Sequence, residues 1–435
     1  MSQVTPEEAA IAHRIRQTLH SMRSSSEDSA RLPELPHIYT EETTYEGRPY
    51  DMPLVTLNSR RCRWLRYGGG CVTCNYNEVA TIAEDCDDDT YSRALLAQVE
   101  RATEIFPPDR FPFWTLSTAG SFFDDSELPH LTRLAILRRL RQLGYQALNF
   151  ESRPEYCRDE ARLTEVRLVF GGAVSVSIGL ESYSDSVRTL CVNKGYSTQV
   201  FLDAARALRR AEFPFNCYVL LGKPLLGAWL EDDGTLFVDW ALHLAEAQGT
   251  LHFAFANGAY LAILMLANLQ PGTLSYRLFR AGCYELPSSW LAVETIRGLQ
   301  PSERHRVVLK GLMRAMPHPL THASTCPTCI GSFRRAHMAF NEGAPFDDSL
   351  DAVHCRCRTT FLETLRIPRN PPSNFDLSKE EGRTELDRGI RTQLERNVAG
   401  LLDRTLLGSL SHGATCRIPI ENRARTAPSR NALHE

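Results

Sequence analysis

The sequence predicts an α/β protein built around a parallel β-sheet. Past residue 53, short apolar runs of strand length alternate with longer stretches of helical periodicity. Strands separated by helices in this rhythm favour a parallel sheet with right-handed crossovers. The chain has 435 residues, which exceeds one typical domain, so we expect a barrel-sized domain with one or two smaller segments.

Six strands and five helices are expected in this region. The strands are expected at residues 53–58, 112–117, 146–151, 173–179, 214–221 and 251–256. The helices are expected at residues 91–106, 127–143, 158–168, 197–211 and 236–248. Before them, the spacing of Ala9, Ile11, Ile15 and Leu19 predicts an amphipathic helix over residues 6–22.

Composition indicates a folded, soluble chain. Hydrophobic residues make up 43% and charged residues 23%, which argues against global disorder. The longest apolar stretch, Ala259 to Leu266, is too short to span a bilayer, and the polar start from Met1 to Glu8 lacks a signal-peptide pattern. We therefore expect a cytoplasmic protein with no membrane partner. In that compartment, the 13 cysteines indicate metal sites and free thiols more than disulfides.

Three cysteines follow the first expected strand: Cys62, Cys71 and Cys74. They can place three thiolates around one metal centre and leave its fourth position without a cysteine, open to an exogenous ligand. The glycines at 68–70 favour this interpretation, because a chain that curls around a cluster needs backbone angles that a side chain opposes. A zinc knuckle and unrelated buried thiols are the alternatives.

Polar residues also follow the later strands. Ligands of parallel sheets bind beyond the carboxyl ends of the strands, so such residues are expected to gather near the cysteines. They are Gly120 and Ser121 after the second strand, Glu151 and Arg153 after the third, Glu181 after the fourth, and Lys223 after the fifth.

In these features the chain resembles the radical SAM superfamily, in which three thiolates hold a 4Fe–4S cluster and S-adenosylmethionine chelates the fourth iron. The eight residues between Cys62 and Cys71 depart from the usual C-x3-C-x2-C spacing. Longer gaps occur in the branch of the elongator catalytic subunit and the radical SAM subunit of archaeosine synthase. Segments that agree with this branch are 117–125, 150–155, 178–182, 192–196 and 269–273. The resemblance implies a partial (β/α)6 barrel.

The resemblance also implies an activity. One electron from the cluster would cleave the sulfonium to a 5′-deoxyadenosyl radical, which removes a hydrogen atom from the substrate. Gly120 and Ser121 lie where the family meets the methionyl amino group, and the alternative is a simple turn. Glu151 and Arg153 resemble an acidic–arginine pair of the family, and the alternative is a surface ion pair.

Glu181 and Lys194 are expected to reach ribose hydroxyls or the carboxylate of S-adenosylmethionine. The alternative is an ordinary helix-start acid and an ordinary loop lysine. A reductase, flavodoxin or ferredoxin is implied as the electron donor.

A second group of cysteines predicts a structural zinc site. Two close pairs can supply four thiolates in a tetrahedron: Cys326, Cys329, Cys355 and Cys357. His322 and His354 are alternative ligands for one position. A second cluster and reduced free thiols are the other interpretations.

Charge bears on the substrate. The formal net charge is −3, with 49 basic and 52 acidic residues, which weakens a tRNA substrate without excluding a local patch. The dense basic group Arg60, Arg61, Arg63 and Arg66 would meet phosphates or pair with the acidic stretch 84–89. Three hypotheses stand: a tRNA-base-modifying enzyme, an enzyme for a small molecule in specialised metabolism, and a non-catalytic iron–sulfur or zinc scaffold.

We expect four segments. Residues 1–45 form an N-terminal helical segment and residues 46–275 the radical SAM core. Residues 276–365 form a C-terminal extension with the four-cysteine zinc site. Residues 366–435 form a tail that is partly helical or disordered, with an amphipathic stretch near 384–409.

Overall fold

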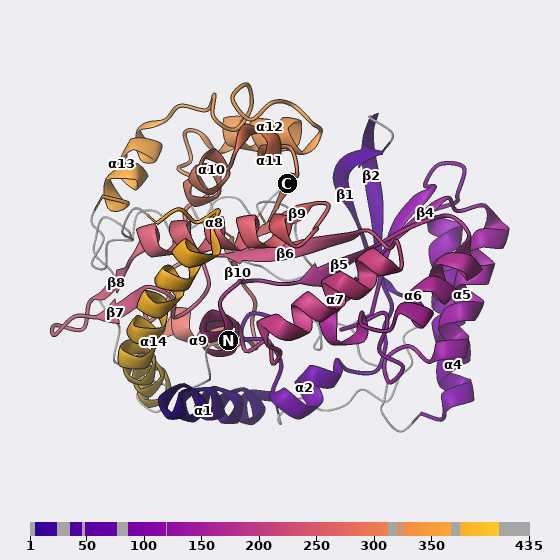
Figure 1. The fold of residues 1–435 in the computed structure, drawn as a ribbon, viewed down its shortest axis with the longest axis horizontal. Helices are drawn as coiled ribbons and strands as arrows, with labels where there is room; N and C mark the ends of the chain where they lie inside the picture. The colour runs from indigo at the N-terminus through magenta and orange to yellow at the C-terminus, as the bar shows by residue number, and fades with distance from the viewer. Residues whose placement is uncertain are drawn as a thin grey trace, which may run out of the picture.

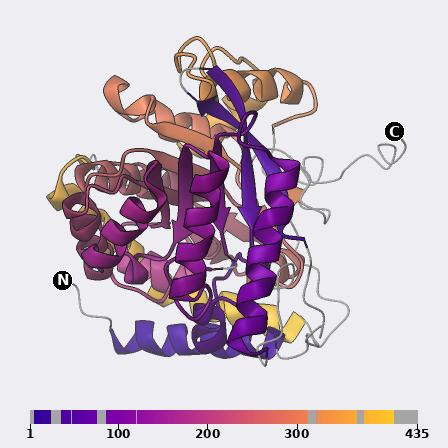
Figure 2. The same cartoon turned by 90° about the vertical axis from the view of Figure 1, so that its right-hand side faces the viewer.

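The computed structural model of the protein describes residues 5–23, 35–45, 48–75, 86–118, 120–311, 321–322, 325–366 and 375–408. At its centre lies an eight-stranded sheet whose strand order follows the chain, β1-β2-β3-β4-β5-β6-β9-β11. The first pair is antiparallel, and every other neighbouring pair is parallel. The sheet curls, and the connecting helices cover its outside (Figures 1 and 2).

The strands of this sheet are β1 (His37–Tyr45), β2 (Arg48–Thr56), β3 (Phe113–Ser117), β4 (Ala147–Ser152), β5 (Ala173–Gly179), β6 (Phe215–Leu221), β9 (Ala262–Leu266) and β11 (Val307–Lys310). Two further antiparallel pairs are β7 (Ala228–Leu230) with β8 (Leu236–Val238), and β10 (Asn268–Leu269) with β12 (Thr321–His322). The α-helices are α1 (Pro6–Arg23), α2 (Arg63–Gly68), α4 (Asp88–Ile105), α5 (His130–Leu143), α6 (Glu160–Phe170), α7 (Thr198–Arg210), α8 (Trp240–Ala256), α9 (Leu274–Arg280), α10 (Trp290–Arg297), α11 (Pro301–Arg304), α12 (Ile330–Asn341), α13 (Arg356–Thr364) and α14 (Glu380–Gly408). A 3₁₀ turn covers Pro154–Tyr156 and a π-helical turn covers Val187–Val192.

The predicted fold class is confirmed. Six parallel strands from β2 to β9 alternate with helices, which makes a partial (β/α)6 barrel. The central sheet has two strands beyond the predicted six: β1, an antiparallel edge, and β11, a seventh parallel strand. The short strands β7, β8, β10 and β12 were not predicted either.

The predicted sixth strand at 251–256 is wrong. These residues belong to α8, and the sixth parallel strand is β9. Leu251, Ala254 and Phe255 are buried, because α8 packs against β6 and β9 on one side and α10 on another. A short apolar run that is buried all round carries no periodicity that separates strand from helix. The helix ends at Ala256 with Asn257 as its C-cap, and Gly258 follows with a φ of 95°.

The two ends of the described chain pack together. Helix α1 lies alongside α14 (Figures 1 and 2), and their apolar faces share one hydrophobic cluster that includes Ile15, Ile390 and Leu394. The Thr5 hydroxyl donates to Glu395 Oε1 at 2.7 Å. The predicted amphipathic stretch is therefore a docking helix up to residue 408, and residues 409–435 lie outside the described part of the chain.

The C-terminal extension shares a core with the barrel. One hydrophobic cluster contains Phe333, Phe340 and Phe361 of the extension together with Trp290 of α10 and Val219 of β6. Among the described residues, no helix has the length and apolar character needed to cross a membrane.

Replacing Leu394 with alanine should lower the free energy of unfolding by about 2–5 kcal/mol, because the side chain is fully buried between α14 and its neighbours. Chemical denaturation measures this. Leu168→Ala is the control, since that leucine is 69% exposed on α6 and its loss should cost little. Equal effects of the two substitutions would contradict the packing of α14.

Candidate cluster and cofactor site

A cavity of about 730 Å³ opens at the carboxyl ends of the parallel strands. Residues from the ends of β3, β4, β5, β6, β9 and β11 line it, together with the loop that follows β2. The structure brings most of the predicted site residues to this cavity: Cys62, Cys71, Cys74, Gly120, Glu151, Arg153, Glu181 and Lys194. Ser121 and Lys223 are not among the lining residues.

The three cysteines after β2 all face the cavity, in a segment that we call the cluster loop, residues 62–74. Cys62 is the residue before α2. Its thiol interacts electrostatically with Arg153 and Cys71. Burial and the neighbouring Glu127 carboxylate raise the pKa of Cys62 to about 12. Of the described residues that line the cavity, no fourth is a cysteine.

Asn193 holds the glycine turn of the cluster loop. Its Nδ2 donates to Gly68 O at 2.8 Å and to Gly70 O at 2.7 Å. Gly69 and Gly70 both have a φ of 75°, in the left-handed region that favours glycine. In return, the Trp64 indole N–H donates to Asn193 O at 2.6 Å. The turn is therefore fixed by a segment more than 120 residues further along the chain.

Gly120 lies against the first cysteine. A Cβ at this position would lie 2.8 Å from Cys62 Sγ and 2.5 Å from Glu127 Oε1, so no side chain fits. Ser121 is fully buried behind the cavity wall, where its hydroxyl accepts from the Arg153 N–H at 3.2 Å. Ser121 thus supports the backbone of Arg153 and does not itself reach the cavity.

Arg153 and Glu151 do not pair with each other. The Arg153 guanidinium donates to Glu155 Oε1 at 2.5 and 2.9 Å and to Lys194 O at 2.5 Å. Burial alone would lower the pKa of Arg153, but Glu155 and the thiols of the cluster loop raise it well above its usual value. Glu151 accepts from the Tyr218 hydroxyl at 2.6 Å. Since Arg153 is only 6% exposed, the surface-pair alternative is excluded for it.

Glu181 and Lys194 form an ion pair of 2.7 Å at the end of β5. A Cβ on Gly179 would collide with the Lys194 amine, so the pair depends on this glycine. Glu181 has a φ of 63°, a conformation that costs about 1–3 kcal/mol and persists only where the surroundings fix it. Its N–H donates to Tyr218 O at 2.8 Å. Burial lowers the pKa of Lys194, but the Glu181 carboxylate, together with Cys71 and Tyr196, raises it above its usual value.

The open side of the barrel is bridged. Lys310 of β11 forms an ion pair with Glu41 of β1, which joins the two edges of the sheet. Helix α12 adds His337 and Asn341 to the cavity wall, and both contact the Leu309 backbone. The C-terminal extension therefore forms part of the cavity.

Two other basic residues that the sequence singled out, Arg60 and Lys223, form local contacts. Arg60 pairs with Asp88 at 2.7 Å and lies over the Tyr91 ring at 4.4 Å. Lys223 is buried and pairs with Glu246 at 2.5 Å. Neither side chain is free to meet a phosphate in the cavity.

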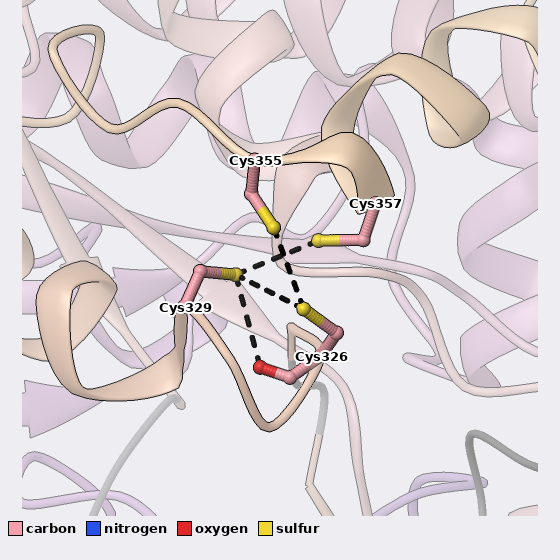
Figure 3. A group of neighbouring side chains, drawn as sticks. All are labelled: Cys326, Cys329, Cys355 and Cys357. Atoms are coloured by element: carbon pink, nitrogen blue, oxygen red, sulfur yellow. Dashed lines mark hydrogen bonds between the residues drawn. The ribbon is translucent and has the colours of Figure 1, made fainter.

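The second group of cysteines forms one compact cluster. The sulfurs of Cys326, Cys329, Cys355 and Cys357 all lie within 4.8 Å of one another (Figure 3). Two of these residues precede α12, and the other two lie at the start of α13. His354 is exposed and does not belong to the group, and the side chain of His322 lies outside the described part of the chain.

The sulfur spacing fits a single tetrahedral ion. Neighbouring sulfurs lie 3.5–3.6 Å apart. Four thiolates at the usual Zn–S distance of about 2.3 Å stand roughly 3.8 Å apart. In a 4Fe–4S cluster each thiolate binds a different iron, which requires a wider set. The Trp290 indole N–H donates to Cys357 Sγ at 3.1 Å, a contact typical of the surroundings of a metal-bound thiolate.

Comparison with known proteins agrees with this geometry. No protein-family model matches the chain. The chain is 26% identical to archaeosine synthase subunit beta of Methanosarcina acetivorans over 320 residues, which cover 72% of this chain and 84% of the relative. It is 29% identical to the same subunit of Thermococcus kodakarensis over 260 residues, which cover 59% of this chain and 75% of that protein. The chain is similar to the archaeosine synthase beta subunits.

This similarity confirms the resemblance to archaeosine synthase that the motifs predicted. Among solved structures, methylornithine synthase is 12% identical with a TM-score of 0.41, and the match covers 78% of this chain and 84% of that chain. The Elp3 protein of Methanocaldococcus infernus is 16% identical with a TM-score of 0.35, over 52% and 53% of the two chains.

Sequence reasoning missed several residues that shape the site. Asn193 and Glu155 lie inside segments that carried the resemblance, but their contacts could not be read from spacing. Tyr218 is one of several aromatic residues in apolar strands and gives no signal of its own. Glu127 lies outside every recognised motif, and only the folded chain reveals it.

Asn193→Gly should lower iron loading, because glycine keeps the backbone conformation but removes both hydrogen bonds to the glycine turn. The local cost is about 1–3 kcal/mol. Iron content after anaerobic reconstitution measures it. Asn257→Gly is the matched control, since it removes one bond at the end of α8 and should leave iron content unchanged. Wild-type iron content in Asn193→Gly would show that the two hydrogen bonds of Asn193 to the glycine turn are not needed for iron binding.

Proposed function

We propose that the chain reductively cleaves S-adenosylmethionine at a 4Fe–4S cluster and uses the radical to take a hydrogen atom from a substrate. The cluster would be held by Cys62, Cys71 and Cys74. The observation that carries the proposal is the convergence of these three thiols on one cavity, with no cysteine for a fourth position among the described lining residues. Gly120 supports it, since only a residue without a side chain can lie this close to Cys62.

A cluster held by these thiolates and reduced by an external donor would supply one electron for cleavage of the sulfonium of S-adenosylmethionine at its C5′–S bond. The protein's own residues would bind and orient the cofactor. Arg153 offers a fixed positive charge next to the thiolates, and the Lys194 amine and Glu181 carboxylate offer partners for charged or hydroxyl groups. Glu151, held by Tyr218, presents a further acceptor. Binding in this cavity would shield the radical from bulk water.

We infer that the C-terminal cysteines hold one structural zinc ion. The compact tetrahedral spacing supports a single ion, and the shared hydrophobic cluster supports a stabilising role. The second cluster considered from the sequence fits this spacing less well.

We propose that the substrate is a base of tRNA and that this chain modifies it in a complex with a second subunit. The names of the two curated relatives, archaeosine synthase subunit beta, support this choice. A small molecule is the second candidate. It is favoured by the net charge of −3 and by a cavity whose open side is bridged by Lys310 and Glu41.

With dithionite, reconstituted wild-type protein should convert S-adenosylmethionine to 5′-deoxyadenosine, and the variant with alanine at Cys62, Cys71 and Cys74 should not. Chromatography of the nucleoside product measures this. Cys86→Ala is the matched control, since that thiol does not line the cavity. Unchanged cleavage in the triple variant would refute the assignment, and iron binding without any cleavage would point to the non-catalytic scaffold.

Added tRNA should increase the rate of cleavage if the substrate is a tRNA base, because a bound substrate consumes the radical productively. Cleavage that does not respond to tRNA, with no RNA in the purified protein, would favour the small-molecule candidate.

Cys326→Ser should release about one zinc ion per chain and lower the melting temperature, because metal-binding free energy at such a site is folding free energy. Metal analysis and a melting curve, both in the triple variant without the cluster, measure this. Cys283→Ser serves as the control, because that buried thiol stands outside the four-cysteine group. Absence of zinc from the parent protein would argue for free thiols.

A further inference from the structure

Glu127 is a fully buried carboxylate next to the first cysteine of the cluster loop. It belongs to the connection between β3 and α5, and no predicted motif includes it. Burial raises the pKa of its carboxyl group to about 7, although the N–H groups of Ser121 and Arg63 counteract this effect. Within the described chain, no lysine or arginine lies within ion-pair distance of it. Such a group is costly to bury, so the contacts that it makes need an explanation.

The two carboxylate oxygens accept from two different segments. Oε1 accepts from the Arg63 N–H at 3.1 Å, directly after Cys62. Oε2 accepts from the Ser121 N–H at 2.6 Å and from the Thr118 hydroxyl at 3.0 Å. Thr118, Gly120 and Ser121 make up what we call the cofactor turn. One side chain therefore ties the start of the cluster loop to the cofactor turn.

The main chain of Glu127 adds a second tie. Its carbonyl oxygen accepts from the Tyr91 hydroxyl at 2.5 Å, and that hydroxyl accepts from the Arg60 N–H at 2.8 Å. Cys62 is thus bracketed on both sides, through Tyr91 at Arg60 and directly at Arg63. These ties fix the position of Cys62 relative to Gly120, whose Cα leaves no space for a side chain between the two.

We infer that Glu127 is a positioning residue that fastens the cluster loop to the cofactor turn, so that Cys62 and the S-adenosylmethionine site keep one fixed geometry. This inference rests on the proposed function. It assigns Glu127 no contact with the cofactor and no part in proton transfer.

For this role both carboxylate oxygens of Glu127 must accept hydrogen bonds, Oε1 from the cluster loop and Oε2 from the cofactor turn. Only a carboxylate on a side chain of this length can accept both. A glutamine has one acceptor oxygen, so either the Arg63 N–H or the Ser121 N–H would face an amide NH₂ group and lose its partner. An alanine removes all three bonds. The two substitutions therefore give different, predictable losses.

Hydrogen–deuterium exchange of the protein without iron tests the fastening directly. In Glu127→Ala, hydrogen–deuterium exchange over residues 60–66 and 118–124 should accelerate by about tenfold or more. The reason is that the Arg63 N–H in the first segment and the Ser121 N–H in the second each lose a charge-assisted hydrogen bond. In Glu127→Gln, only one of the two segments should accelerate. Exchange equal to wild type at both segments in both variants would overturn the inference.

Cofactor binding tests the consequence. Glu127→Gln, once loaded with iron, should bind S-adenosylmethionine about tenfold or more weakly, and the change that the cofactor induces in the electron paramagnetic resonance spectrum should shrink. Wild-type affinity and spectrum in this variant would overturn the positioning role.

Glu294→Gln is the matched control. Glu294 is also a buried carboxylate, but it lies on α10 and pairs with Arg297 and Arg358. It should lower the melting temperature without changing exchange at either segment. If wild-type protein bound neither iron nor S-adenosylmethionine, the proposed function would fail, whereas the exchange experiment would still decide whether Glu127 fastens the two segments.

Discussion

The candidate site depends on hydrogen bonds that hold an irregular loop in place. Apart from the short helix α2, the cluster loop has no regular structure, yet three of its side chains must face one cavity. Asn193 fixes its glycine turn, and the Val72 N–H donates to Val192 O at 2.9 Å. These contacts replace the backbone ladder that a helix or strand would have supplied. A cluster bound there would therefore find its ligands already arranged.

The C-terminal extension contributes to the same cavity. Cys329 immediately precedes α12, and this helix carries His337 and Asn341 to the cavity wall. A metal ion at the four cysteines would hold the beginning of this helix, while Leu309 holds its end through hydrogen bonds to the two side chains. The ion would thus stabilise one wall of the substrate region as well as the extension itself. The ion pair between Lys310 and Glu41 closes the barrel beside this wall.

Much of the architecture could be predicted from the sequence, because it depends on local periodicity. Five of the six predicted strands lie where expected, as strand length and flanking turns indicated. The prediction of the sixth strand failed because α8 is buried along most of its surface. Strand β1 was missed because its sequence, HIYTEETTY, contains no apolar run. The four-cysteine group was found because two close pairs of cysteines have the spacing typical of a metal site.

The contacts inside the candidate site were harder to predict. The resemblance marked Glu151 and Arg153 as an acidic–arginine pair, but it did not reveal that Arg153 donates to Glu155 or that Glu151 accepts from Tyr218. Partners of buried charges are set by which strands become neighbours, and that information is not local. Glu127 illustrates the same limit, since its carboxylate joins Arg63 to Ser121, two residues that are far apart in sequence.

In the proposed function, three thiolates of this chain bind a cluster whose fourth iron is open to S-adenosylmethionine. Mössbauer spectroscopy of protein reconstituted with ⁵⁷Fe tests it most directly, because that method distinguishes iron sites by their ligands. We expect one of about four iron sites to change its parameters when S-adenosylmethionine is added, while the others stay as they were. A spectrum in which no site responds to S-adenosylmethionine would contradict the account.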